Sequence, residues 1–487
     1  MKKIALFLTL CVALLAAVLL SNTLRFTSRQ IQVEPIQQVA IDEASTATRL
    51  AGAIRFQTVS YQDSGQIQYG EFVRLHRYLE HSFPKLHSTL TKEVIGQYSL
   101  LYKWQGRNEK LKPIVLMAHQ DVVPVEPNSL ANWEQPPFEG RVINGYIWGR
   151  GAIDDKFALM SIMEAIELQL AHGFQPQRTV YLAFGHDEEV GGRAGAAQIA
   201  DLLQKRGVDP EYVLDEGSSI TVGFFRGINQ PVALLGIADK GYLSLELSVA
   251  TESGHSSMPP DQTAIGILSA AVSKLEQQQL PATLGGVPLQ TLDYVGREMP
   301  LGKKLAMANL WLFKPLLVRQ LSALPSTMQS LRTTTAPTMI EGGFKENVLP
   351  NSARAVVNFR LLSADSSERV VAHVTSVVDD PRVHVKKFGV SNSEPSTVSD
   401  VRARGYQIIE RTLRQVFPGI LVAPALCIGG TDSEYYAKLT KNIYRFSPLR
   451  LRPEDIERLH GMNERTSIKD FAGSVKFYYH LISNSAQ

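Results

Sequence analysis

The sequence predicts an α/β protein in which a mostly parallel sheet, covered by helices, is interrupted by an inserted α+β unit. Short apolar stretches such as residues 114–118 and 179–185 alternate with a helical pattern such as residues 155–172. Apolar strands between helices are typical of parallel sheets that are covered on both faces. Near Ala238 the pattern changes to longer alternating strands, and the first pattern returns after Asp400.

The first half of the chain supplies most elements of the sheet. The predicted helices cover residues 44–54, 69–82, 155–172 and 194–205, and the predicted strands cover residues 114–118, 179–185 and 212–214. Gly173 and Gly207 provide helix stops. His119, Glu188 and Asp215 follow strand ends, where ligand sites of parallel sheets lie.

The second half supplies the inserted unit and completes the sheet. We expect strands over residues 242–251, 339–342, 353–361 and 382–388 with helices over 262–278 and 366–378, and then helix 401–416, strands 421–428 and 443–446, and helix 467–482. Residues 301–324 are rich in Leu and Met, include Trp311 and Phe313, and are interrupted by Pro315. This stretch predicts an extra helical element.

Length and charge limit the classes of function. The chain has 487 residues, more than one core usually supports, so two domains are expected. The net charge of +3, without a dense run of Lys and Arg, gives no footprint of nucleic-acid binding. Small-molecule or peptide substrates fit better.

The N-terminus predicts a membrane anchor or an export signal. Lys2 and Lys3 precede an apolar run over residues 4–20. The flank SNTLRF lacks a small-x-small cleavage site, which favours an uncleaved anchor, and a cleaved signal peptide is the alternative. The two lysines place the N-terminus in the cytoplasm and the body on the other side, periplasmic or extracellular. Polar residues 22–42 predict a tether.

The two cysteines exclude a disulfide-stabilised fold. Cys11 lies in the apolar run, which leaves Cys427 alone in the folded part. Its neighbours are apolar, so we expect a small buried residue rather than a nucleophile.

Two motifs at strand ends predict metal chemistry. His119 directly follows a strand, and Asp121 can accept the second imidazole N–H, as metal-binding histidines require. Glu188 and Glu189 are adjacent acids after a buried strand, and they repel each other unless a cation neutralises them. One would bind metal while the other handles protons. The alternative is that His119 and Asp121 have a purely structural role.

Two further motifs are ambiguous by themselves. Asp154 and Asp155 follow a glycine-rich turn, where one can bridge two metals or simply cap the helix. His460 lies in a loop before the last helix and can be an ordinary loop residue. Together, the His and carboxylate set without sulfur suits hydrolytic Zn²⁺, with Mn²⁺ or Co²⁺ as alternative ions.

The order of these motifs resembles the M20 family of metallopeptidases, in its branch of carboxypeptidase S and N-acyl-amino-acid hydrolases. The resemblance runs from about residue 45 to the C-terminus and rests on AHQD, GRGAIDDK, DEEVGG, LDEG and LHGMNER. It implies a zinc-peptidase type of fold with two zinc ions per subunit. Five ligands are implied: His119 and Asp215 on one metal, Glu189 and His460 on the other, and Asp154 between them. Glu188 would be the general base, Asp121 would orient His119, and the Asp154–Asp155 peptide would be cis.

The inserted unit resembles the lid or dimerisation domain of the family. His255 in SGHSSMP would stabilise the oxyanion, in dimeric members that of the other subunit. Asn347 and Arg360 would bind substrate, with Arg360 holding a carboxylate. Gly430 lies in a GGTD loop that resembles one near the substrate carboxylate, and a helix N-cap at Thr431 or Asp432 fits that loop equally well.

The implied domains and function follow from this resemblance. The domains are a hydrophobic segment (1–21), a tether (22–42), two catalytic parts (43–236 and 391–487) and the lid between them (237–390). The function is hydrolysis of an amide next to a free carboxylate, in a short peptide or an N-acyl amino acid, with a homodimer through the lid. The alternatives are a catalytically silent, membrane-tethered binding protein and a biosynthetic deacylase. The 301–324 element lines an acyl pocket, or serves as core or dimer contact.

Overall fold

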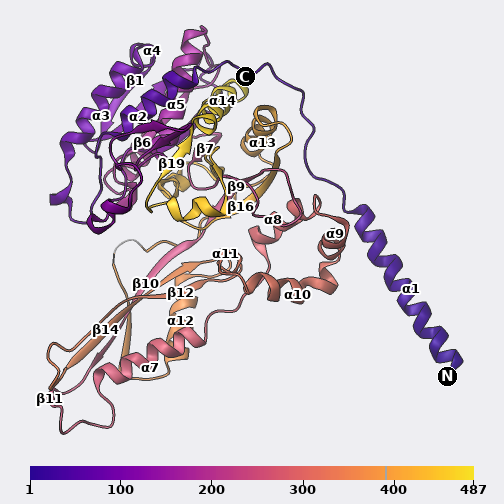
Figure 1. Ribbon diagram of the computed structural model, residues 1–487, viewed down its shortest axis with the longest axis vertical. Helices are drawn as coiled ribbons and strands as arrows, with labels where there is room; N and C mark the ends of the chain where they lie inside the picture. The colour runs from indigo at the N-terminus through magenta and orange to yellow at the C-terminus, as the bar shows by residue number, and fades with distance from the viewer. Residues whose placement is uncertain (390–391, 487) are drawn as a thin grey trace.

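The computed structural model describes residues 1–389 and 392–486, without the side chains of residues 325 and 326. Figure 1 shows a body built on a large sheet, a smaller unit that extends from it, and the helix α1 (Lys2–Arg25), whose N-terminal part projects away from both. By length and composition, α1 can cross a membrane. The domain boundaries drawn from the sequence stay a prediction.

The large sheet has ten strands and is parallel at its centre. The order is β1 (Thr91–Ile95), β2 (Ser99–Trp104), β6 (Val180–Gly185), β3 (Ile114–His119), β7 (Tyr212–Asp215), β17 (Ile443–Arg445), β9 (Val232–Asp239), β8 (Ile220–Thr221) and β18 (Arg450–Leu451), with β16 (Leu421–Cys427) beside β9. Strands β6, β3, β7 and β17 run parallel, and β16 runs parallel to β9. The antiparallel edge strands β1 and β2 were not predicted, because Lys92, Glu93 and Lys103 mask their apolar residues.

Both faces of this sheet are buried, as the apolar strands predict. Along β3, Leu116 belongs to the core on one face, whereas Val115 and Met117 belong to the core on the other. The covering helices are α2 (Glu43–Ile54), α3 (Tyr69–Ser82), α4 (Pro84–Thr89), α5 (Lys156–Ala171), α6 (Ala196–Lys205), α13 (Arg404–Val416) and α14 (Ile468–Ser485). The α/β class is therefore confirmed.

Short elements complete the body. They are the sheet β4 (Arg141–Ile143), β5 (Tyr146–Trp148) and β19 (Arg465–Ser467), and the 3-10 turns η1 (Ser64–Gln66), η2 (Pro127–Asn132), η3 (Glu188–Val190), η4 (Asp432–Lys438) and η5 (Pro453–Arg458). The pairing of β19 with β5 brings the C-terminal motif beside the glycine-rich turn that begins at Gly149.

The inserted unit has a separate core. Its antiparallel sheet has the order β12 (Thr334–Gly342), β14 (Ser352–Leu361), β10 (Gly241–Ala250) and β15 (Val383–Lys387), packed against α7 (Ala264–Gln277) and α12 (Ser367–Val378). A two-stranded ribbon, β11 (Gly254–His255) with β13 (Val348–Leu349), lies at the tip farthest from the body (Figure 1).

The extra helical element predicted over residues 301–324 consists of two helices, α9 (Leu301–Ala308) and α10 (Leu310–Ser322), and it is preceded by α8 (Gly286–Gly296) and followed by α11 (Pro325–Met328). The interruption falls at Asn309, not at Pro315, which lies inside α10. Asn309 has non-helical backbone angles (φ −126°, ψ 47°), and its side chain donates to Leu305 O. The helix therefore ends at Asn309.

The predicted tether contacts the body. Gln30 Nε2 donates to Val422 O over 2.9 Å, and Val422 N donates back to Gln30 Oε1 over 2.8 Å. Gln38 Nε2 donates to Gln415 O. The segment after α1 thus follows the body's surface.

Candidate metal centre

Three parallel strands bring their C-terminal residues to one edge of the sheet. β3 ends at His119, which is in register with Gly185 at the end of β6, and β7 ends at Asp215. The turn η3, with Glu188 and Glu189, follows β6 after two residues. The strand-end prediction from the sequence therefore places these side chains near one another.

Asp154 lies between two histidines. Its Oδ1 is 2.9 Å from His119 Nε2, and its Oδ2 is 3.1 Å from His460 Nε2. His460 Nε2 is also 3.3 Å from Glu189 Oε2. One ligand atom each from His119, Asp154 and Glu189 lie within 4.8 Å of one another, so the three can hold a metal ion. A carboxylate facing two imidazoles is the arrangement expected of a metal bridge.

Asp121 links the imidazole of His119 to the turn η3. Its Oδ2 accepts hydrogen bonds from Ser60 Oγ (2.7 Å) and Glu189 N (3.1 Å), and its Oδ1 accepts from Glu188 N (3.2 Å). Its Oδ1 also lies 3.4 Å from His119 Nδ1, and its carbonyl oxygen lies 3.0 Å from the same atom. Asp121 therefore fixes both the imidazole and the turn that carries the paired glutamates.

The glycine-rich turn aims Asp154 at the histidines. Asp155 is the N-cap residue of α5 by position, yet neither aspartate side chain caps the helix. The helix-cap alternative therefore holds for Asp155 by position, without a capping hydrogen bond from its side chain. Asp155 instead accepts from His119 N over 3.4 Å, and the peptide between Asp154 and Asp155 is cis, as the resemblance implied.

The charges at this edge fit a cation. Burial, with nearby carboxylates, raises the pKa of Glu188, Asp155 and Glu216 well above the ordinary value. Burial would also raise the pKa of Asp154, but hydrogen bonds from the two histidines lower it. Bonds to Asp154 and Glu189 raise the pKa of His460 to about 10. Glu189 Oε1 is buried without a hydrogen-bond partner among the described residues. These side chains can act as metal ligands, and a bound metal ion would supply the positive charge that compensates their carboxylates.

Asp215 lies at the same edge, outside the close group of three. Its Oδ2 accepts from Ser433 N over 2.8 Å. Thr431 caps η4 by accepting from Ser433 N, so the N-cap alternative holds for Thr431. Asp432 is not the cap: it is buried, and its pKa is raised well above the ordinary value by burial and the charge of Asp215.

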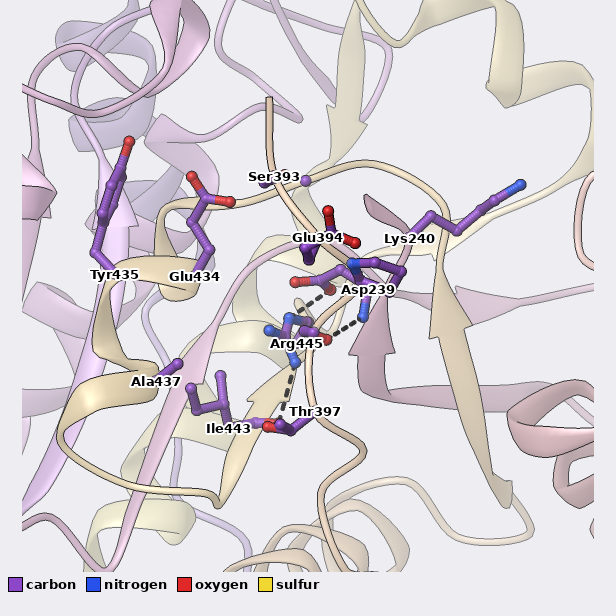
Figure 2. A pocket seen from close by; sticks show the side chains of 13 residues that line it. Asp239, Lys240, Ser393, Glu394, Thr397, Glu434, Tyr435, Ala437, Ile443 and Arg445 are labelled. Atoms are coloured by element: carbon purple, nitrogen blue, oxygen red, sulfur yellow. Dashed lines mark hydrogen bonds and ion pairs between the residues drawn. The ribbon is translucent and has the colours of Figure 1, made fainter. Parts of the chain in front are cut away.

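Gly430 is exposed and lines a cavity of about 370 Å³ where the body meets the inserted unit (Figure 2). At its base Arg445 Nε lies 2.5 Å from Asp239 Oδ1, and burial raises the pKa of Asp239 to about 7 although Arg445 opposes the shift. Lys240 reaches away from this pair in Figure 2, and its Nζ donates to Gln329 O and Arg332 O.

The predicted substrate residues of the inserted unit lie at opposite ends of it. His255 and Asn347 are exposed at the tip, where Ser256 N donates to Asn347 O and Ser257 Oγ lies 2.8 Å from His255 Nδ1. Arg360, at the end of β14 nearest the body, stacks on Tyr242 with its guanidinium 4.6 Å from the ring centre. Within one chain, the tip is remote from the carboxylates at the sheet edge (Figure 1).

Sequence reasoning missed one buried pair, Arg150 and Glu464. Glu464 Oε2 accepts from Arg150 Nη1 over 2.6 Å, while its Oε1 accepts from the N–H groups of Gly151 and Ile153. Arg150 Nη2 donates to the carbonyl oxygen of His460. The pair thus clamps the two loops that carry Asp154 and His460. Glu464 stands in the LHGMNER motif beside His460, but no local pattern marks it as buried.

Comparison with known proteins identifies the family. The profile of peptidase family M20/M25/M40 matches residues 115–484. The chain belongs to this family. A carboxypeptidase S-like protein of Dictyostelium discoideum is 44% identical over 96% of this chain and 91% of the relative. The N-fatty-acyl-amino acid synthase/hydrolase PM20D1 of Xenopus tropicalis is 44% identical over 90% and 85%.

Solved structures show the same fold. The M20 metallo-carboxypeptidase Sso-CP2 of Sulfolobus solfataricus matches with a TM-score of 0.64 and 18% identity, over 92% of this chain and all of that one. Human carnosine dipeptidase 1 matches with a TM-score of 0.62 and 15% identity, over 91% and 96%. The prediction of an M20 metallopeptidase fold and of a hydrolase is confirmed, and the family is metal-dependent.

Proposed function

We propose that this M20 member is a zinc hydrolase that cleaves an amide next to a residue with a free carboxylate. The observation that carries the proposal is the position of Asp154 between His119 and His460, with Glu189 beside them. That donor set, without sulfur and with several carboxylates, suits hydrolytic zinc.

Five side chains are assigned to two zinc ions. His119 and Asp215 would hold one, Glu189 and His460 the other, and Asp154 both. The unpartnered Glu189 Oε1 and the pKa of Glu189, which burial raises, support a site for positive charge. When bound, zinc lowers the pKa of a water molecule and polarises a carbonyl group.

Glu188 is assigned as the general base. Its carboxyl is not engaged in the Asp154 contacts, and its backbone is held by Asp121. Burial raises its pKa well above the ordinary value, which suits a group that accepts and returns a proton near neutral pH. Glu188 takes the proton of the attacking water and delivers it to the leaving nitrogen.

Arg360 is assigned to the substrate carboxylate. Burial, and then the nearby charge of Arg360, lower the pKa of the Lys240 amine to about 8. Two cations near the junction of body and inserted unit favour an anionic substrate group, and Gly430 lines the cavity there. The names of the relatives, carboxypeptidase S and N-fatty-acyl-amino acid hydrolase, fit substrates with a free carboxylate.

A homodimer through the inserted unit is part of the proposal. His255 and Asn347 are exposed at a tip remote from the metal centre of their own chain, and a second copy would accept them. There His255 would donate a hydrogen bond to the oxyanion. We also propose that α1 stays attached and holds the body on the non-cytoplasmic side of the membrane.

Substrate profiling of the full, zinc-loaded chain tests the proposal. The panel compares N-fatty-acyl amino acids, N-acetyl amino acids and blocked dipeptides, each with a free and an amidated carboxyl group. Hydrolysis that requires the free carboxylate supports the proposal. Stoichiometric zinc without hydrolysis of any member would favour a silent binding protein, and a preference for N-acetyl amino acids would favour a deacylase.

A further inference from the structure

Helices α9 and α10 carry an apolar surface that the body does not cover. The side chains of Leu301 in α9, of Trp311 and Leu316 in α10, and of Leu324, which follows α10, are 68%, 62%, 53% and 57% exposed. Exposed apolar residues gathered on one element mark a binding surface for a partner or a membrane. Helices α8 and α9 lie between the body and α1 in Figure 1.

The helix α1 packs directly on this surface's edge. Asn309, between α9 and α10, is fully buried, and its Nδ2 donates to Leu19 O over 3.1 Å. Asn22 Nδ2 donates to Asn309 Oδ1 over 2.8 Å, and Trp311 Nε1 lies 3.4 Å from the same oxygen. The apolar run of α1 ends at residue 20, so Trp311 lies level with the end of that run.

A second set of contacts fixes α1's exit relative to α8. Arg297 stacks on Phe26 with 4.1 Å between guanidinium and ring centre, and it donates to Thr27 O. Arg29 pairs with Asp293 over 3.0 Å. Phe26, Thr27 and Arg29, which follow α1, therefore all contact residues 293–297, and these contacts fix the level of Trp311 relative to α1.

The charge of the surface matches an anionic bilayer. Residues 299–340 contain no Asp or Glu, but they contain Lys303, Lys304, Lys314, Arg319 and Arg332. Lys314 and Arg319 are exposed beside the apolar side chains of α10. Apolar residues with Trp and flanking Lys and Arg are typical of helices that lie in the membrane interface.

We propose that α9 and α10 lie in the interface of the bilayer that α1 spans, with Trp311 among the lipid headgroups and Lys314 and Arg319 toward anionic lipid. The proposal rests on the proposed anchor and adds a second membrane contact to it. It also assigns a role to the 301–324 element, whose apolar face would meet lipid rather than a substrate or a second copy.

Tryptophan fluorescence tests the proposal on the full chain with an intact N-terminus, reconstituted in vesicles. Trp104, Trp133 and Trp148 are buried in the body, so Trp311 is the tryptophan that lipid can reach. We expect brominated phosphatidylcholine to remove the part of the emission that Trp311→Phe also removes. The loss should be greater with phosphatidylglycerol present and smaller in high salt.

The controls separate the alternatives. In a Trp311→Phe background, Val94→Trp puts an exposed tryptophan on β1, far from α1, and lipid quenching is not expected there. Quenching of Trp311 by aqueous acrylamide but not by lipid overturns the proposal, and quenching by neither indicates a second copy and overturns it too. A chain that does not float with vesicles overturns the anchor and the surface together. Hydrolysis of a soluble substrate by the same sample reports separately on the proposed reaction.

Discussion

The metal centre and the tip of the inserted unit have opposite surroundings. At the sheet edge, His119 and Asp121 are 2% and 0% exposed, and His119 Nδ1 lies 3.4 Å from Asp121 Oδ1. At the tip, His255 is exposed and contacts Ser257 of its own loop. A buried cluster of acids needs a bound cation or protons to neutralise it, whereas an exposed imidazole can contact another chain.

The largest expected effect tests the buried metal centre alone. Glu188→Gln keeps the size of the side chain but removes its ability to take a proton. We expect kcat to fall about 10³-fold, in the range for a general base, with zinc content unchanged by elemental analysis. A near-normal kcat in this variant would remove Glu188 from the proposed role.

The next largest effect tests the exposed tip of the inserted unit. His255→Ala should lower kcat about 10²-fold, as loss of one oxyanion donor does, without loss of zinc. When equal amounts of the His255→Ala and Glu188→Gln chains are mixed, activity should return to about a quarter of wild type. Half of the randomly paired dimers contain one chain of each kind, and each of these dimers has one complete site.

That mixing experiment separates two arrangements of the site. Recovery requires the intact His255 of the Glu188→Gln chain to serve the intact metal centre of the His255→Ala chain. Two inactive variants that stay inactive after dissociation and reassociation would instead place His255 in the site of its own chain.

Much of the buried metal centre could be predicted from sequence, because its residues follow strand ends and glycine turns in recognisable order. The Arg150–Glu464 clamp could not, because it joins loops more than three hundred residues apart, and nothing local marks Glu464 as buried. The position of the tip could not be predicted either. Alternation predicts the strands, but the length of β14 decides that Arg360 and Asn347 lie at opposite ends.

A smaller effect is expected when the clamp is weakened. Glu464→Gln removes the negative charge that pairs with Arg150. It also replaces the carboxylate whose Oε1 accepts hydrogen bonds from Gly151 N and Ile153 N. We expect zinc affinity to fall about 10- to 100-fold, as for other residues that position metal ligands, with recovery of kcat at high zinc. Glu454→Gln, at an exposed acid in the same segment, is the matched control and should leave affinity unchanged. Equal loss of kcat at saturating zinc would argue against a positioning role.

The smallest expected effect is the pH dependence of zinc stabilisation, which separates the two regions by charge. Without metal, Glu188, Asp155 and Glu216 have raised pKa values, as does His460. The folded chain then binds more protons than the unfolded chain, so the stability of the metal-free protein falls as pH rises above about 4.3. Zinc needs the deprotonated ligands, so its stabilisation rises over the same range.

Thermal unfolding of zinc-loaded and chelated samples measures this difference. A fixed zinc concentration of about 100 times the Kd at pH 7 adds about 2.7 kcal/mol, which raises Tm by about 3 °C for a chain of this size, and we expect the gap to widen from pH 6 to pH 8. His255→Ala should show the same widening, because the tip holds none of the buried acids, whereas Glu188→Gln should show less of it. A gap that stays constant with pH would mean that the buried acids are already ionised without metal, and the contrast between the two regions would then lie in exposure alone.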